Sequence, residues 1–180
     1  MFNGIIYNQG VIKKILKRKK GINLFLKSSL KLKKNNIGMS VSCDGVCLTL
    51  ISVKNNLIEF YLSNETLVRS KFKNITIGNK INLELPIKFG QKISGHICQG
   101  HVDTVGIVKS ISKIDKSYVF DFLIKSNFKK SLIEKASILI NGVSLTISKI
   151  TKNGFKVWII PHTLKLTNLK YLNKKDLVNI

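Results

Sequence analysis

The chain repeats itself at a fixed distance. Residues 45–49 (GVCLT) return as residues 142–146 (GVSLT), and residues 65–67 (ETL) return as residues 162–164 (HTL). Both pairs of segments lie 97 residues apart. Because an unbroken offset over such a length requires equal strand and turn lengths, the two segments belong to a duplicated structural unit. Two like units imply two like binding surfaces.

The repeat also predicts where the chain divides. Near the start of each unit the offset becomes 96, which pairs Gly4 with Gly100 and requires a single one-residue length change. A joint is expected around residues 84–97, where proline and glycine interrupt the strand-like pattern. We therefore expect one domain over residues 1–97 and a second over residues 98–180, each of a plausible size for a small domain.

The local pattern is typical of β-structure. Segments rich in β-branched and aromatic residues alternate with Asn, Gly and Lys turns. They cover residues 41–53, 57–62, 80–85, 104–111, 118–124, 137–150 and 155–160. Asn153 and Gly154 predict a tight hairpin, and residues 64–68 and 126–130 could form short helical turns. Each unit is expected to be a closed all-β barrel or sandwich.

Composition excludes several classes of protein. Hydrophobic residues make up 44% of 180 residues, enough for real cores and too many for a disordered tail. Cys43, Cys47 and Cys98 form an odd set without a C-x-x-C pair. This argues against a disulfide framework and a zinc site and favours a reducing, cytoplasmic setting.

Nothing in the sequence predicts a membrane segment. Phe2, Ile5 and Ile6 precede the first basic residues, which is the reverse of a secretory signal. No apolar run approaches the roughly 20 residues that a spanning helix needs.

The charge balance raises a nucleic-acid partner as a remote alternative. The formal net charge is +22, from 31 Lys and Arg against 9 Asp and Glu, which is the electrostatic footprint of a nucleic-acid binder. Against this, only Arg18 and Arg69 are arginines, so groups that read bases are scarce. The lysines are scattered except at residues 13–20, where a solvated hairpin tip is favoured over a phosphate-binding patch.

Six motifs then occur in order along the whole chain. They are residues 1–6 (MFNGII), 44–49 (DGVCLT), 64–67 (NETL), 95–103 (GHICQGHVD), 141–146 (NGVSLT) and 160–164 (IPHTL). Each motif is weak alone, but together they closely resemble the riboflavin synthase family of the alpha-chain type.

The resemblance implies a fold, an activity and partners. The fold would be two tandem Greek-key β-barrels, each binding one 6,7-dimethyl-8-ribityllumazine. The enzyme would dismutate two such molecules to riboflavin and 5-amino-6-ribitylaminouracil, without cofactor or metal. The site would form between the first barrel of one subunit and the second barrel of its neighbour in a homotrimer. Docking with lumazine synthase, which makes the substrate, stays open, as does a non-catalytic lumazine- or flavin-binding protein on the same fold.

Three residues are the candidate catalytic groups. His101 is the first candidate for a proton shuttle, because an imidazole titrates near neutral pH. The alternative for His101 is a structural role in the turn between the units. For His96 we favour that structural role. Cys47 and Ser144 occupy equivalent places and would line the two pockets. Addition of Cys47 to the acceptor ring is as good an account as simple packing of a small thiol.

The resemblance also predicts substrate-binding residues in both units. In the first unit they are Phe2, Gly4, Ile5, Ile6, Ser40, Cys47, Leu48, Thr49, Ser63, Asn64, Glu65 and Thr66. In the second unit they are Gly100, His101, Val102, Lys135, Ser144, Leu145, Thr146, Ile160, Pro161, His162 and Thr163. Phe2 would cap the ring or anchor the first strand, and either threonine could simply fill its strand.

Three features depart from the family pattern. The family usually has Thr at the position of Asn3 and Asp at the position of Asn141. It also continues beyond residues 178–180 into a C-terminal helix that packs the trimer, whereas this sequence stops before it. Absence of that helix is expected to weaken trimer formation and, with it, a site shared between subunits.

Overall fold

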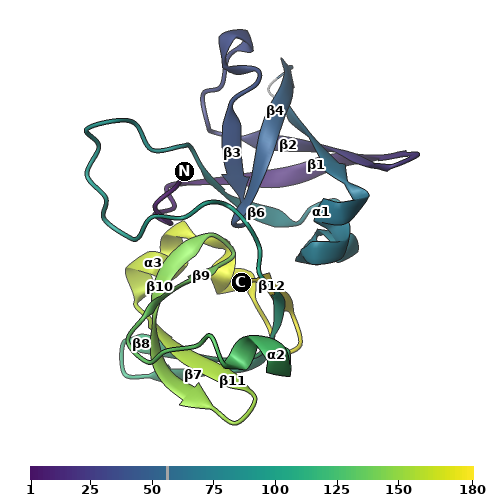
Figure 1. The fold of residues 1–180 in the computed structure, drawn as a ribbon. Helices are drawn as coiled ribbons and strands as arrows, with labels where there is room; N and C mark the ends of the chain where they lie inside the picture. The colour runs from purple at the N-terminus through teal and green to yellow at the C-terminus, as the bar shows by residue number, and fades with distance from the viewer. Residues whose placement is uncertain (56) are drawn as a thin grey trace.

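The computed structural model describes residues 1–55 and 57–180 and shows two β-sheets, one above the other (Figure 1). The strands of the first half are β1 (Asn8–Arg18), β2 (Gly21–Ser28), β3 (Ser40–Cys43), β4 (Val46–Lys54), β5 (Leu57–Ser63) and β6 (Lys80–Glu84). They close into an antiparallel barrel in the order β1-β2-β5-β4-β3-β6. Its helical turns are η1 (Lys34–Asn36), α1 (Asn64–Arg69) and η2 (Lys71–Asn74).

The second half repeats this order. Its strands are β7 (Val105–Ile114), β8 (Ser117–Leu123), β9 (Ser137–Ile140), β10 (Val143–Thr151), β11 (Gly154–Ile159) and β12 (Leu177–Asn179). The sheet order is β12-β7-β8-β11-β10-β9. Its helical turns are α2 (Ser126–Lys129), α3 (Pro161–Leu166) and η3 (Asn168–Tyr171). The predicted all-β tandem repeat is therefore confirmed.

The two sheets differ where they close. In the first half, β3 and β6 pair through Ser42 and Glu84. Both halves also join their β3–β4 or β9–β10 turn to the last strand, because the N–H of Asp44 donates to the Asn82 carbonyl (2.9 Å) and the N–H of Asn141 donates to the Asn179 carbonyl (3.0 Å). The predicted Greek-key connection stays a prediction.

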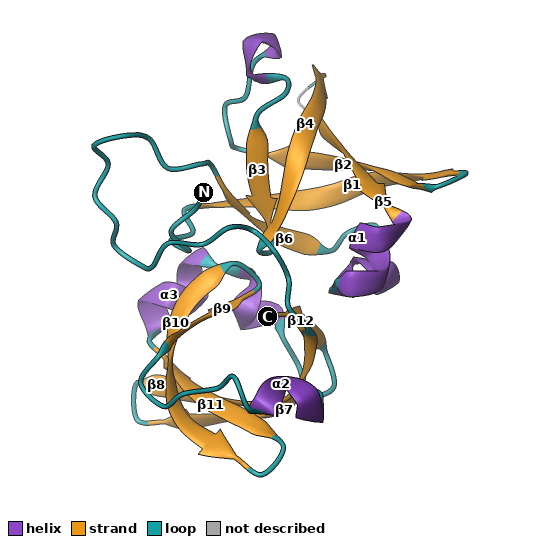
Figure 2. Ribbon diagram, viewed as in Figure 1, coloured by secondary structure: helices purple, strands orange, loops and turns teal. Residues whose placement is uncertain are grey.

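The structure corrects the long predicted strands. Residues 41–53 form two strands, β3 and β4, because Asp44 (φ 47°) and Gly45 (φ 84°) make a tight turn between them. Residues 137–150 are likewise divided at Asn141 and Gly142. The short helical turns predicted near residues 64–68 and 126–130 are confirmed as α1 and α2 (Figure 2), whereas α3 was not predicted.

The basic segment at residues 13–20 lies on an extended hairpin. Arg18 pairs with Gly21, so Lys19 and Lys20 form the tip of the β1–β2 hairpin that projects from the first barrel (Figure 1). The side chains of Lys17 to Lys20 are exposed, as expected for a solvated tip. In the described part of the chain, no helix is long and apolar enough to cross a membrane.

Each half has its own core, and each half also contributes one side chain to the packing of the other core. Phe60, Leu24 and Leu50 are among the buried residues of the first core, and residues such as Phe122 and Phe155 fill the second. Ile6 comes from the first half but packs in the second core, while Val102 packs against the first. The domain boundary predicted between residues 97 and 98 stays a prediction.

Candidate functional site

Two short arms cross between the halves. The N-terminal arm, residues 2–6, lies against the second half, where the N–H of Ser144 donates to the Gly4 carbonyl (2.8 Å). The joint arm, residues 98–102, lies against the first half, where the N–H of Cys47 donates to the Gly100 carbonyl (2.8 Å). These equivalent contacts place each arm on the strand that carries the repeated motif of the other half.

Glycine allows this close approach. A Cβ at Gly4 would lie 2.7 Å from the Cβ of Ser144, and one at Gly100 would lie 2.6 Å from the Cβ of Cys47. Both glycines also have positive φ, of 74° and 85°. Any larger residue would push the arm off its strand, so the two glycines fix the arms at the motifs.

The first face combines β3, β4 and the start of α1 with the joint arm. Ser40 pairs with Thr49 across the β3–β4 ladder. Because β4 and β5 are antiparallel, the start of β4 and the end of β5 lie at one edge, where α1 begins. The predicted residues Ser40, Cys47, Thr49, Ser63, Asn64, Glu65, Thr66, Gly100 and His101 belong to the segments that form this face, whereas Leu48 is buried in the first core and Val102 packs against that core. Thr49 and His101 are exposed and Cys47 is half-buried.

The second face repeats this arrangement with β9, β10, the start of α3 and the N-terminal arm. Ser137 pairs with Thr146, as Ser40 pairs with Thr49. The N–H of Lys135 donates to the Ile147 carbonyl (2.8 Å), which holds Lys135 just before β9. The predicted residues Gly4, Ile5, Lys135, Ser144, Thr146, Ile160, Pro161, His162 and Thr163 belong to the segments that form this face, whereas Ile6 is buried in the second core and Leu145 packs against that core. Thr146, His162 and Lys135 are exposed.

The short helices at the two faces begin with different caps. The hydroxyl of Ser63 accepts a hydrogen bond from the N–H of Thr66 (3.2 Å) and so caps α1. In α3 the first helical residue is Pro161, whose fixed φ and missing N–H suit that position. The structure thus explains why Ser63 and Pro161, although not equivalent, both lie where a strand turns into a helix.

The predicted catalytic residues are divided between the faces. His101 follows Gly100 on the joint arm and is therefore close to Cys47 along the backbone contact. Ser144 lies on the second face, beside the N-terminal arm. Phe2 is buried and its ring lies against Gly100, because a Cβ there would lie 3.0 Å from the ring. Phe2 also pairs with Cys98 in an antiparallel bridge between the two arms.

His96, for which we favoured a structural role from the sequence, contacts Ser144. Nδ1 of His96 lies 2.7 Å from the hydroxyl oxygen of Ser144, and the N–H of His96 donates to the Asn3 carbonyl (3.1 Å). Burial lowers the pKa of His96, which favours the neutral ring. The Gly95–His96 motif was the only sequence signal for this contact.

The buried carboxyl of Glu84 and the buried thiols of Cys98 and Cys43 have structural rather than reactive roles. Burial raises the pKa of Glu84, although its carboxylate accepts hydrogen bonds from the N–H groups of Asn3 (2.7 Å) and Gly4 (3.1 Å). Burial, and then the Glu84 carboxylate, raise the pKa of Cys98 to about 11. Burial also raises the pKa of Cys43 well above its usual value. Cys47 is the one cysteine of the three that is only half-buried.

A cavity of about 530 Å³ adjoins the joint arm. His96, Gly100 and His101 line one side, and apolar residues of the second half, among them Phe128 and Leu139, line the other. The hydroxyl of Thr104 also belongs to the wall and has no hydrogen-bond partner among the described residues. An apolar wall with a few polar groups is typical of a small-molecule site.

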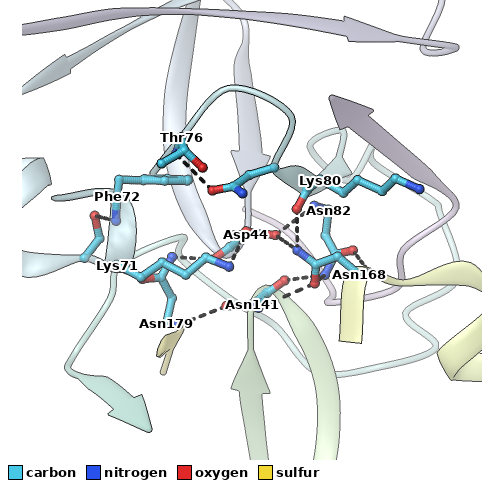
Figure 3. A network of polar contacts seen from close by, with 11 residues as sticks. Asp44, Lys71, Phe72, Thr76, Lys80, Asn82, Asn141, Asn168 and Asn179 are labelled. Carbon is cyan, nitrogen blue, oxygen red and sulfur yellow. Dashed lines mark hydrogen bonds and ion pairs between the residues drawn. The ribbon is translucent and has the colours of Figure 1, made fainter. Parts of the chain in front are cut away.

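A buried polar network fixes the two halves relative to each other (Figure 3). The side chain of Asn82 donates to the Asn141 carbonyl (2.9 Å) and accepts from the N–H of Asn168 (2.7 Å). The side chain of Asn179, its equivalent, donates to the Asp44 carbonyl (2.9 Å) and accepts from the N–H of Lys71 (2.8 Å). The asparagine side chain of each half therefore binds the backbone of the other half, and the two sets of contacts are related by pseudo-twofold symmetry.

Comparison with known proteins identifies the family. Residues 3–86 and 99–180 each match the Lumazine binding domain family. The chain is 36% identical over 182 residues to a riboflavin synthase of Buchnera aphidicola subsp. Baizongia pistaciae, covering all of this chain and 86% of that protein. The chain belongs to the riboflavin synthase family. A member from Photobacterium leiognathi is 35% identical over 181 residues, covering all of this chain and 83% of its own length.

Solved structures show the same fold. LumP complexed with 6,7-dimethyl-8-(1'-D-ribityl) lumazine superposes with a TM-score of 0.86 at 25% identity, covering 99% of this chain and 97% of LumP. LumP complexed with riboflavin gives a TM-score of 0.88 at 24% identity, with the same coverage. The riboflavin synthase family and LumP therefore share the tandem arrangement described here.

Proposed function

We propose that this protein is a riboflavin synthase. It converts two molecules of 6,7-dimethyl-8-ribityllumazine into riboflavin and 5-amino-6-ribitylaminouracil. The observation that carries the proposal is the pair of equivalent faces, each built from one half and completed by an arm that crosses from the other. A reaction between two identical molecules requires two like sites, and its family relatives are riboflavin synthases over the full length of this chain.

The chemistry requires positioning more than reactive groups. The electron-poor ring of the substrate makes a methyl proton acidic, and loss of that proton gives a carbon nucleophile. Two rings held in contact react with an advantage of up to about 7–11 kcal/mol in favourable cases. The exchange then moves a four-carbon unit from one ring to the other, so that one molecule becomes riboflavin and the other the diamine.

The roles of individual residues are part of the proposal. His101 shuttles protons at the first face, and Cys47 either adds to the acceptor ring or packs against it. At the second face Ser144 contacts the ring, and the neutral His96 next to its hydroxyl holds that hydroxyl in place. The threonines Thr49 and Thr146 are exposed on their strands and offer hydroxyls to the ring edge. Protein groups supply all of these contacts, without cofactor or metal.

We also propose how the chain divides and assembles. The domains are residues 1–97 and 98–180, and β6 beside β3 in the order β6-β3-β4-β5 supports a Greek-key description. A homotrimer in which the first face of one subunit meets the second face of its neighbour would explain why exposed threonines belong to the site. The three free thiols support a location in the cytoplasm. Lumazine synthase is a candidate partner there.

Product formation tests the proposal. Purified protein is mixed with 6,7-dimethyl-8-ribityllumazine alone, and riboflavin fluorescence is followed while 5-amino-6-ribitylaminouracil is measured by chromatography. We expect one molecule of each product for every two substrate molecules, with a rate that rises faster than linearly with protein concentration if subunits share the site. Absence of riboflavin at saturating substrate and high protein concentration would refute the proposal that the protein is a riboflavin synthase.

A non-catalytic lumazine- or flavin-binding protein is the second candidate. The likeness to LumP in complex with both kinds of ligand favours it. Both repeated motifs are intact in this chain, at residues 45–49 and 142–146, which favours the enzyme. The same assay separates the two, because a binder would change the fluorescence of the lumazine without forming riboflavin.

A further inference from the structure

A second cavity lies between the two halves, away from both faces. Its volume is about 590 Å³, and its walls come from residues 71–81 of the first half and residues 168–177 of the second. These two segments are related by the 97-residue offset, so the cavity lies on the pseudo-twofold axis of the chain. None of its lining residues was predicted from the sequence as a site residue.

The cavity is cationic. Lys71, Lys80 and Lys175 line it, against the carboxylate of Asp176. Lys71 is already paired, because its Nζ lies 2.7 Å from Oδ2 of Asp44. Lys80 and Lys175 are exposed and face no described carboxylate within ion-pair distance. Two ammonium groups thus lack a carboxylate partner within the described part of the chain.

Local crowding of positive charge supports an anionic ligand. Nζ of Lys80 lies 2.5 Å from the phenol oxygen of Tyr171 and 4.1 Å from the centre of its ring. Nζ of Lys170 lies 4.9 Å from the same ring centre. Hydrogen bonds from these lysines lower the pKa of Tyr171. An anion between the lysines would relieve their mutual repulsion.

The remaining wall suits an uncharged ring. Ile75, Leu172 and Leu177 line the cavity together with the aromatic side chain of Tyr171. The volume falls within the range of about 300–1,000 Å³ that small-molecule sites occupy. Charged groups on one side and an apolar wall on the other match a ligand that carries both phosphates and a ring.

We propose that this cavity binds a nucleoside diphosphate. Its phosphates would contact Lys80 and Lys175, and its base would lie against Ile75, Leu172 and Leu177. The wall residues Lys71 and Asn168 also belong to the network that joins the halves, since both contact the carboxylate of Asp44. A bound nucleotide therefore bridges the halves and stabilises their relative arrangement.

Calorimetric titration of ADP into the full chain tests this proposal. The cavity variant is K80Q/K175G; glycine suits position 175 because Lys175 has a φ of 79° and its equivalent is Gly78. The matched control is K13Q/K17Q, which removes the same charge from exposed positions on β1. We expect the cavity variant to weaken ADP binding at least tenfold, equal to about 1.4 kcal/mol, and the control to weaken it less than twofold. ADP should also bind more tightly than pyrophosphate.

Two results would overturn the proposal. Equal losses of affinity in both variants would show that ADP binds through the overall positive charge of the protein. Equal affinities of pyrophosphate and ADP would show that the apolar wall does not bind the base. Unchanged melting temperatures of the ligand-free variants check folding, and Lys80→Gln alone serves if the double variant does not fold. Neither lysine belongs to a riboflavin synthase face, so the outcome is independent of the catalytic assay.

Discussion

Positions 44 and 141 hold equivalent turns with different chemistry. Oδ1 of Asp44 accepts from the N–H of Asn82 (2.7 Å), and Oδ1 of Asn141 accepts from the N–H of Asn179 (3.0 Å). The ion pair of Asp44 with Lys71 is replaced in the second half by a pair of amides, because position 168 carries Asn. Asn141, where the resemblance led us to expect Asp, therefore faces the amide of Asn168 and not a lysine.

Replacement of Asp44 tests this exchange. We expect Asp44→Asn to lower the free energy of unfolding by about 3 kcal/mol, because it leaves the ammonium of Lys71 in a largely buried site without a counterion. The double variant D44N/K71N recreates the amide pair of the second half and should recover more than half of that loss. Urea unfolding of both variants measures the recovery, and a double variant no more stable than Asp44→Asn would contradict the exchange.

The titration of His96 provides a second test at this scale. Burial lowers its pKa, so the neutral ring is favoured in the folded protein. The contribution of His96 to the free energy of unfolding is therefore complete above the usual histidine pKa of about 6.5. It decreases as the pH falls from that value to the pKa of His96 in the folded protein. NMR titration of the imidazole should give a midpoint below 6.5, while a midpoint at or above that value would show that the ring is not desolvated.

At the scale of elements, the β3–β4 and β9–β10 turns pack directly on each other. A Cβ at Gly142 would lie 2.7 Å from the backbone nitrogen of Gly45. Both are glycines with positive φ, so the turns combine a restricted backbone with a close contact. The interface between the halves depends on this contact as much as on the asparagine network.

Comparing alanine substitutions at Gly142 and Gly78 separates the effect of backbone strain from the effect of the close contact. Gly142→Ala introduces both backbone strain and a clash, whereas Gly78→Ala introduces only strain, because nothing lies within 4 Å of a Cβ there. We expect Gly78→Ala to cost about 1 kcal/mol and Gly142→Ala to cost about 2 kcal/mol more through overpacking. Thermal unfolding of both variants measures the difference. Equal losses would show that the turns do not touch.

The local residue pattern predicted the strands, and the family resemblance predicted the residues of both faces, but neither predicted the crossing of the arms. An offset relates equivalent residues and says nothing about which half an arm contacts, and Ile6 packs in the second core because of tertiary packing alone. The division at Asp44 was visible as an Asp-Gly pair yet was missed, because residues that favour strands stand on both sides of it. The contact of His96 with Ser144 depends on a long loop whose path no local pattern fixes.

At the scale of the whole molecule, duplication explains the activity. Two like barrels are joined by exchanged arms and exchanged asparagines, so that each face depends on both halves. The residues of the faces were predicted from the family resemblance, and the repeated motifs at residues 45–49 and 142–146 relate the two faces to each other. The cavity between the halves could not, because its lysines are unrelated by the repeat and become neighbours only in the fold.

The number of ligands bound by each chain tests this account most directly. Riboflavin, the product, is titrated into the purified protein by calorimetry at concentrations well above the dissociation constant. Two equivalent faces predict two riboflavin molecules per chain, falling to one when T49A/C47A disables the first face. Binding of a single molecule by the unaltered chain would contradict the claim that the duplicated fold provides two sites.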